Sequence, residues 1–432
     1  MAGPRQRRDP ADGGAIDHAA DTLATVARSH LGRVVAALVR ELGDFELAEE
    51  SAQEALVAAL EHWPRDGIPD RPDAWLITVA RRRAIDRLRR AAVGQAKLAE
   101  LELHAQSSST GEPADDTLDV VFLCCHPALS REAQVALTLR VVCGLSVAAI
   151  ARAFIAPEAT VAQRILRAKR KIVQAGLPLR RPAPEELPTR LREVLAVIYL
   201  LFNEGHLTTA GPRSERSDLA RDAEWLAGLL ADLMPREPEV LGLLALIRLH
   251  RARDRARFTA DGALVLLRDQ DRSLWDHAAI AQAGALVARA LRMGRPGPYQ
   301  IEAAIAACHA EAPTWEATRW AEIVLLYDRL MARADTPVVR LNRAIALRHV
   351  LGARAALDEI EPLAAPLAGY HLFHAARAEL LRELGRDREA EPADARALAL
   401  AGNLAERALL ERRLAAVDRG ANRGLHGRDP AG

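Results

Sequence analysis

Apolar residues return every three or four positions along most of this chain, and this spacing is typical of helices. Ile77, Ala80, Ala84 and Leu88 follow it, and the same spacing recurs in 161–172. Half of the residues are hydrophobic but 4% are aromatic, which favours stacked helices over sheets. We therefore predict an all-α protein, whose 432 residues leave room for two or three domains.

Charge and cysteine content narrow the class of protein. The formal net charge is +1, so any nucleic-acid signal must come from local patterning. Four cysteines are too few for a disulfide framework and indicate a reducing compartment. Cys124 and Cys125 precede His126, but neighbours on a helix point in different directions and no second CxxC pair exists, so we interpret the cysteines as structural.

Polar and proline-rich stretches divide the chain. The N-terminus lacks the apolar core of a signal peptide and no apolar run reaches the roughly 20 residues that span a bilayer, so we expect a cytoplasmic protein without membrane contact. The predicted divisions are a disordered tail at 1–18, a helical domain at 19–92, a linker at 93–116, a second domain at 117–177, a linker at 178–188, a long helical domain at 189–418 and a disordered tail at 419–432.

Two helices of the first domain carry opposite charge. The stretch from Glu46 to Leu60 has an alanine-rich apolar side and an acidic side, which suits either a solvated face or a docking surface. The later stretch 70–90, with Asp70 as a good N-cap, carries a cluster of arginines. Guanidinium groups along one rigid face suit a row of phosphates, although such helices are also common solvated surfaces.

The stretch 145–172 predicts a helix-turn-helix. Ser146 can cap a first helix, and a short turn at Ile155–Pro157 precedes a second helix with one apolar and one basic face. In such a pair the second helix reads base edges near its N-terminus and holds phosphates with its basic residues. The alternative is a helical hairpin with a basic surface.

These residues resemble the sigma factors of the extracytoplasmic-function (ECF) group, within the sigma-70 family. The helix pair is similar to their region 4.2, with Ile155 where the turn usually has glycine. Ala48-Glu49-Glu50 with Gln53-Glu54 resembles region 2.2, and Trp75-Leu76 with Ala80–Arg90 resembles regions 2.3 and 2.4. The order of the two blocks and the linker between them make the resemblance more specific than either motif.

The resemblance implies partners and site residues. The partners would be the RNA polymerase core enzyme (β′ clamp helices and β flap) and promoter DNA. Core binding would fall to Glu46, Glu49, Glu50, Gln53 and Glu54. Reading and melting of the −10 element would fall to Trp75, Arg81, Arg82, Arg83, Arg87, Arg89 and Arg90. The −35 element would be contacted by Glu158, Thr160, Gln163, Arg164, Arg167, Lys169, Arg170 and Lys171.

The remainder of the chain resembles a sigma subfamily with a long tetratricopeptide-like (TPR-like) C-terminal extension, often encoded beside DGPF-domain proteins. The similar stretches are 199–205, 238–245, 266–272, 294–305 and 341–344. Gly352 and Gly385 sit in like surroundings 33 residues apart, close to the roughly 34-residue TPR period. We therefore predict TPR-like helical repeats, which would offer a groove to a protein or ligand partner.

No pattern in this extension predicts catalysis, and we expect no catalytic residue, cofactor or metal. Asn203 and Glu204 lie beside His206, but Gly205 suits a position just past a helix end. Three aspartates at 269, 271 and 276 lack the calcium-loop pattern, and Asp261-Gly262 suits the turn of a small hairpin.

The sequence thus predicts a non-enzymatic sigma factor with a fused regulatory domain. Two alternatives remain: a stand-alone helix-turn-helix regulator with a helical-repeat sensor, and a TPR scaffold whose basic helices are incidental. The regulator would bind duplex DNA without core polymerase, and the scaffold would show no salt-dependent affinity for DNA.

Overall fold

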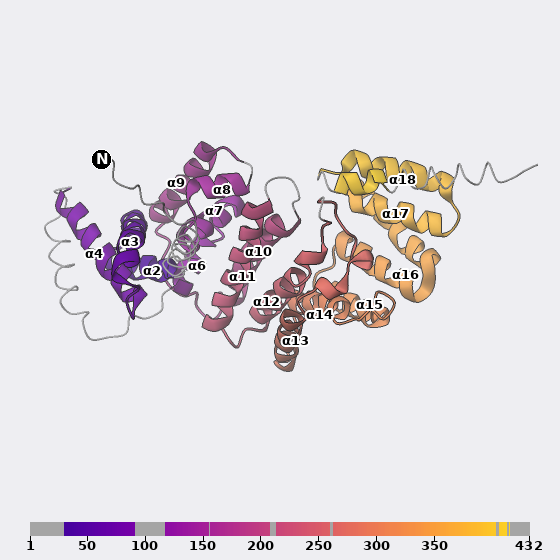
Figure 1. Cartoon of the computed structure of the whole chain (residues 1–432), viewed down its shortest axis with the longest axis horizontal. Coiled ribbons are helices and arrows are strands. Elements are labelled where there is room, and N and C mark those ends of the chain that lie inside the picture. Colours follow the sequence, from indigo (N-terminus) through magenta and orange to yellow (C-terminus); the bar gives the residue numbers. More distant parts are fainter. Residues whose placement is uncertain are drawn as a thin grey trace, which may run out of the picture. The chain divides into compact units, whose positions relative to one another are not determined.

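The computed structural model describes residues 30–90, 117–154, 156–207, 213–259, 262–402, 406–412 and 414. Within them the regular secondary structure is helical, which confirms the predicted all-α class (Figure 1). The predicted terminal tails and the linker at 93–116 lie outside these residues. The contacts divide the chain into two compact units, 1–201 and 202–432. None of the described helices has the length and hydropathy needed to cross a membrane.

The first three helices of the first unit are α2 (Leu31–Leu42), α3 (Phe45–Asp66) and α4 (Pro72–Arg90). Asp44 caps α3 by accepting hydrogen bonds from the backbone N–H groups of Glu46 and Leu47 at 3.0 and 3.1 Å. Because α4 begins at Pro72, its N-cap position falls on residue 71, and the prediction of Asp70 as the cap is wrong. Ile77, Ala80 and Ala84 are buried as predicted, whereas Leu88 is half-buried.

Four more helices follow in the first unit: α6 (Thr117–Cys124), α7 (Arg131–Val141), α8 (Val147–Ala153) and α9 (Glu158–Gln174). The Ser146 hydroxyl accepts a hydrogen bond from the N–H of Ala149 at 3.1 Å, which confirms the predicted cap of the first helix in the pair. Helix α2 packs on α6 and α7, and at Gly32 the backbone comes close to Thr117 and Val142. Residues 30–90 and 117–174 therefore belong to one packed unit.

The second unit begins within α10 (Leu187–Leu207) and continues as a series of helices. They are α11 (Arg213–Leu233), α12 (Pro238–Arg251), the short 3₁₀ turns η1 (Asp254–Ala256), η2 (Leu267–Asp269) and η3 (Arg272–Leu274), α13 (His277–Arg292), α14 (Pro298–Ala310), α15 (Trp320–Met331), α16 (Pro337–Ile360), η4 (Glu361–Leu363), α17 (His371–Glu383) and α18 (Asp387–Leu400). Gly352 and Gly385 both have positive φ, 85° and 70°, which glycine adopts without the steric cost of a side chain. TPR-like repeats stay a prediction.

One expectation for this unit is corrected and another is borne out. Helix α10 continues through Gly205 to Leu207, so the prediction of a helix end before Gly205 is wrong. The expected small hairpin is present as an antiparallel bridge between Phe258 and Leu264, flanked by backbone hydrogen bonds from Thr259 to Ala263 and from Val265 to Arg257. Of the three aspartates, Asp271 and Asp276 cap η3 and α13 by accepting backbone N–H groups.

Helices α12 and α14 pack closely because Gly242 has no side chain. A Cβ atom at Gly242 would lie 2.7 Å from the backbone nitrogen and 2.8 Å from the Cα of Gln300. Beside this contact, the Glu239 carboxylate of α12 accepts hydrogen bonds from the N–H groups of Tyr299 and Gln300 at 3.1 Å each. A side chain of one helix thus caps the N-terminus of another.

Replacing Gly242 with alanine should lower the free energy of unfolding by about 1–3 kcal/mol, because the backbone of α14 must move away. Gly228 in α11 is the matched control, since no heavy atom lies within 4 Å of an added Cβ. Gly228→Ala should be neutral or stabilising by up to about 1 kcal/mol. Urea unfolding followed by circular dichroism measures both, and equal midpoints for the two variants would contradict the expectation.

Candidate nucleic-acid and polymerase interface

Helix α9 presents a basic face because its opposite face is buried. Val161, Ile165, Ala168 and Ile172 are each at most 5% exposed, as their spacing predicts. On the outer side, the predicted −35 residues Glu158, Thr160, Gln163, Arg167, Arg170 and Lys171 are exposed, and Arg164 is half-buried. The side chains that could meet DNA therefore stand on a helix fixed from behind.

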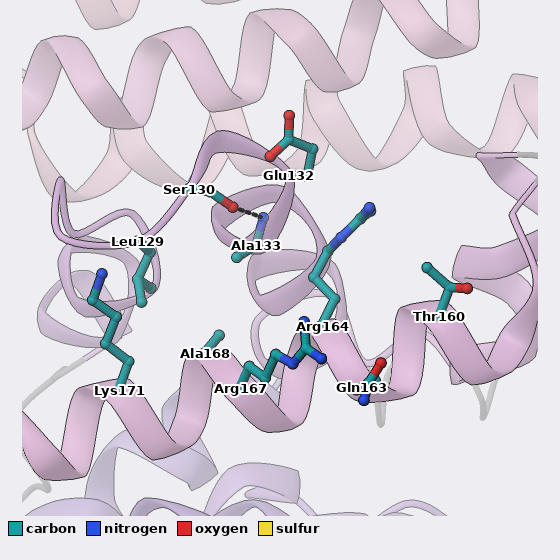
Figure 2. Close-up of a pocket in the computed structure, with 10 residues that line it drawn as sticks. All are labelled: Leu129, Ser130, Glu132, Ala133, Thr160, Gln163, Arg164, Arg167, Ala168 and Lys171. Carbon is teal, nitrogen blue, oxygen red and sulfur yellow. Dashed lines mark hydrogen bonds between the residues drawn. The ribbon is translucent and has the colours of Figure 1, made fainter.

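A recess of about 450 Å³ separates α9 from the start of α7 (Figure 2). Its α9 wall carries Thr160, Gln163, Arg164, Arg167, Ala168 and Lys171, and its other wall carries Leu129, Ser130, Glu132 and Ala133. The pKa of Glu132 is held below its ordinary value by a hydrogen bond from its own backbone N–H and another from Ser130, with Arg164 adding to the effect. A carboxylate therefore stands opposite the basic wall.

The acidic face of α3 and the arginine face of α4, which the sequence suggested as two surfaces, lie against each other. Arg87 bonds both Glu50 and Glu54, and Arg83 Nε lies 3.9 Å from Glu54 Oε2. Hydrogen bonding to Glu54 raises the pKa of Arg87 above its ordinary value. Four predicted DNA and polymerase residues are thus engaged with one another.

Arg81 has a separate partner that sequence reasoning missed. Its Nε donates to Glu41 Oε2 at 2.8 Å, and this hydrogen bonding raises the pKa of Arg81. Nearby, Trp75 is half-buried and its ring packs edge-on against Trp63, with centroids 5.5 Å apart. Further along α4, Arg82, Arg83, Arg89 and Arg90 are exposed. The exposed part of the predicted −10 surface is therefore the C-terminal half of α4.

Glu49 differs from the other predicted polymerase residues because it is 2% exposed. Lys169 of α9 donates a hydrogen bond to Glu49 Oε2 at 2.6 Å. Arg140 Nε of α7 lies 2.8 Å from Glu49 Oε1, without the alignment of a hydrogen bond. In contrast, Glu46 is exposed, and Glu50, Gln53 and Glu54 are half-buried.

This contact joins residues from three places in the sequence. Arg140 was not predicted as part of any site, and no local pattern could reveal it, because its partner lies on another helix of the fold. Lys169, predicted for DNA, is turned toward Glu49 instead of standing on the exposed face. The side chains of Glu49 and Lys169 are therefore paired with each other.

Replacing Glu49 with glutamine should lower the free energy of unfolding of the first unit by roughly 3 kcal/mol, because two cations lose their buried counter-charge. The exposed neighbour on the same helix provides the control: Glu46→Gln should change stability by less than about 0.5 kcal/mol. Urea unfolding followed by far-ultraviolet circular dichroism measures the difference. Equal stabilities would show that Glu49 bears no net stabilising contact.

The cysteines and the metal-binding residue types complete the candidate sites. All four cysteines are buried and free, and burial raises the pKa of Cys125 to about 11. Among the described residues, no group of three or more His, Cys, Asp or Glu side chains is arranged to hold a metal ion.

Comparison with known families follows the same division. Residues 26–93 match Sigma-70 region 2, residues 120–172 match Sigma-70 region 4, and residues 190–291 match a family of unknown function, DUF6596. Uncharacterized protein R00370 of Rhizobium meliloti (strain 1021) is 46% identical over 391 residues, covering 88% of this chain and 92% of that protein. No solved structure matches the chain.

The two matched regions contain α3 with α4 and α8 with α9, the helices on which the sequence resemblance depends. The chain therefore belongs to the sigma-70 family of RNA polymerase sigma factors, as an ECF-type member with a helical C-terminal extension. Its role lies in transcription initiation, with core polymerase and promoter DNA as partners.

Proposed function

We propose that this sigma factor directs core polymerase to its promoters through three surfaces and controls that activity through its second unit. The α9 face, from Glu158 to Lys171, contacts the −35 element. The exposed end of α4 contacts the −10 element, and the acidic side of α3 docks on the β′ clamp helices. The observation that carries the proposal is the basic face of α9, held above a buried apolar stripe behind a capped first helix.

The arrangement of charges adds a step to this proposal. Glu49, Glu50 and Glu54 are engaged by Lys169, Arg140 and Arg87 in the isolated chain. Docking on polymerase through these carboxylates requires that such pairs separate. Separation from Glu49 releases Lys169, and separation from Glu50 and Glu54 releases Arg87, each a cation of a proposed DNA surface. We infer that binding to core polymerase separates these ion pairs within the first unit and leaves Lys169 and Arg87 free to contact DNA.

Lys171 and Gln163 should have separable roles in DNA binding. When core polymerase is assembled with the Lys171→Ala sigma factor, its affinity for DNA should fall on all promoters. The slope of log K against log salt concentration should become shallower by about one, because one phosphate contact is lost. Gln163→Ala should instead cost about 1–3 kcal/mol at a single base pair and leave the slope unchanged. Promoter binding titrated over a range of salt concentrations measures both.

The exposed Arg192 of α10 gives a control for this series, since it lies outside the helix pair. Arg192→Ala should leave both the slope and the sequence preference unchanged. If Lys171→Ala has no more effect than this control, α9 is not the DNA surface. Equal binding of duplex DNA with and without core polymerase would favour a stand-alone regulator.

Glu46 gives the cleanest test of the polymerase surface, because it is exposed and its replacement leaves the buried pairs intact. Glu46→Arg should weaken binding to core polymerase by about tenfold or more. The reason is that an arginine would place a positive charge against a partner surface that complements an acidic face. Glu61→Arg makes the same charge change at another exposed position of α3 and should bind normally. Fluorescence anisotropy with labelled sigma factor gives the two affinities, and equal values would reject this surface.

The proposed control by the second unit is better tested by point substitutions than by truncation. A cut near residue 178 would remove the start of α10, where Arg190 donates to the Phe122 carbonyl at 2.6 Å and Glu193 pairs with Arg131 at 2.8 Å. Such a cut would damage the first unit directly. Substitutions within 202–432 that alter transcription, while core binding is retained, would support a regulatory role.

A further inference from the structure

Three arginines of the second unit stand together without a carboxylate partner. Arg253, Arg257 and Arg272 are half-buried, and no carboxylate of the described residues lies within 4.0 Å of their guanidinium nitrogens. By contrast, Arg343 of the same unit pairs with Asp328 and Glu359. Partly buried cations are ordinarily paired, so the missing counter-charge requires an explanation.

The groups that do contact these arginines are neutral. Arg253 Nη2 lies 2.9 Å from His250 Nδ1, and Arg257 Nη1 lies 2.9 Å from His206 Nδ1. Arg272 Nη1 donates to the backbone carbonyls of His309 and Ala312 at 2.8 and 2.7 Å. A ring nitrogen that accepts from a guanidinium carries no proton, and neutral acceptors leave the positive charge of all three arginines in place.

The histidines add no positive charge to the cluster. Burial, followed by the neighbouring arginines, lowers the pKa of His309 to about 4 and lowers the pKa values of His206 and His250. Two carboxylates act on the arginines from beyond 4.0 Å, Asp254 on Arg257 and Arg253 and Glu316 on Arg272. Asp254 is itself shared, since it also lies 3.8 Å from Arg251 and 3.5 Å from the neutral His206. The cluster therefore keeps an excess of positive charge at neutral pH.

Unpaired polar atoms gather at the same place. Arg272 Nη2, Trp275 Nε1 and His309 Nδ1 are buried and have no hydrogen-bond partner in the described structure. The Arg272 guanidinium carbon lies 4.4 Å from the centre of the Trp275 ring. A buried polar group without a hydrogen-bond partner is unfavourable, so a ligand or water that satisfied these atoms would stabilise the unit.

Aromatic rings continue from this cluster toward the surface. The His309 ring centre is 5.2 Å from that of Trp320, and Trp320 is 4.7 Å from Trp315 and 3.8 Å from His349. His349 is exposed, and both tryptophans are half-buried. Planar groups are thus available beside the arginines, where stacking adds to charge recognition.

We propose that this arginine-tryptophan cluster binds a small organic anion, a carboxylate or a phosphate ester with a planar group. The anionic group is held by Arg253, Arg257 and Arg272, and the planar group packs on Trp315 and Trp320. This site goes beyond the proposed sigma function, and direct binding tests it whether or not the second unit controls transcription.

Isothermal titration calorimetry of the full-length chain with phenyl phosphate and with benzoate tests the proposal. Inorganic phosphate and acetate serve as the matched anions without a ring. We expect saturable binding of one ringed anion, weakened about tenfold or more by Arg253→Gln. Arg255→Gln, at an exposed arginine two positions away, should leave binding unchanged. Stronger binding of phenyl phosphate indicates a phosphate ester as the ligand class, and stronger binding of benzoate indicates a carboxylate.

Trp315→Ala separates the two halves of the site and guards against a folding defect. Trp315→Ala should weaken binding of the anion that carries a ring, and it should leave any binding of the matched anion without a ring unchanged. Circular dichroism of each variant checks the fold, and Arg253→Lys, which keeps the charge, should recover part of the affinity. Absence of saturable binding by both ringed anions overturns the proposal. So does equal binding by Arg253→Gln and Arg255→Gln, or binding of a polyglutamate peptide without binding of either small anion.

Discussion

A buried carboxylate between two cations holds the first unit together. Glu49 is 2% exposed and meets Lys169 and Arg140, which come from the two other helices packed around it. Charges removed from water are costly unless they are matched, so the three helices stay together as long as no other partner supplies the counter-charge. The packing of α2 on α6 and α7 supports the same arrangement.

The same principle explains why overall charge says little about this protein. The net charge of +1 reflects 59 basic and 58 acidic residues, and some of these charges are paired in the fold, among them Arg81 with Glu41 and Arg87 with Glu50 and Glu54. On α9, Arg167, Arg170 and Lys171 are exposed, and apolar packing on the opposite face fixes the helix in place. An electrostatic attraction to DNA would thus be local, as the sequence pattern predicts.

Local features could be predicted from the sequence because their causes lie within one or two turns of chain. The buried stripe of α9 and the cap at Ser146 follow from spacing and residue type, and both are confirmed. The pairing of Lys169 with Glu49 joins positions 120 residues apart and depends on tertiary packing, which no periodicity encodes. The error at Gly205 has a related cause, since a glycine signals a helix end only when tertiary contacts do not carry the helix onward.

The sharing of Arg87 between Glu50 and Glu54 has a thermodynamic consequence for the assembled polymerase. If polymerase takes the carboxylates and DNA takes the guanidinium, each partner removes a competitor of the other. The two affinities are then linked, and linkage is reciprocal: the factor by which core polymerase raises affinity for DNA equals the factor by which DNA raises affinity for core polymerase. One arginine and two glutamates would in this way make the sigma factor a poor ligand for either partner alone and a better one for both together.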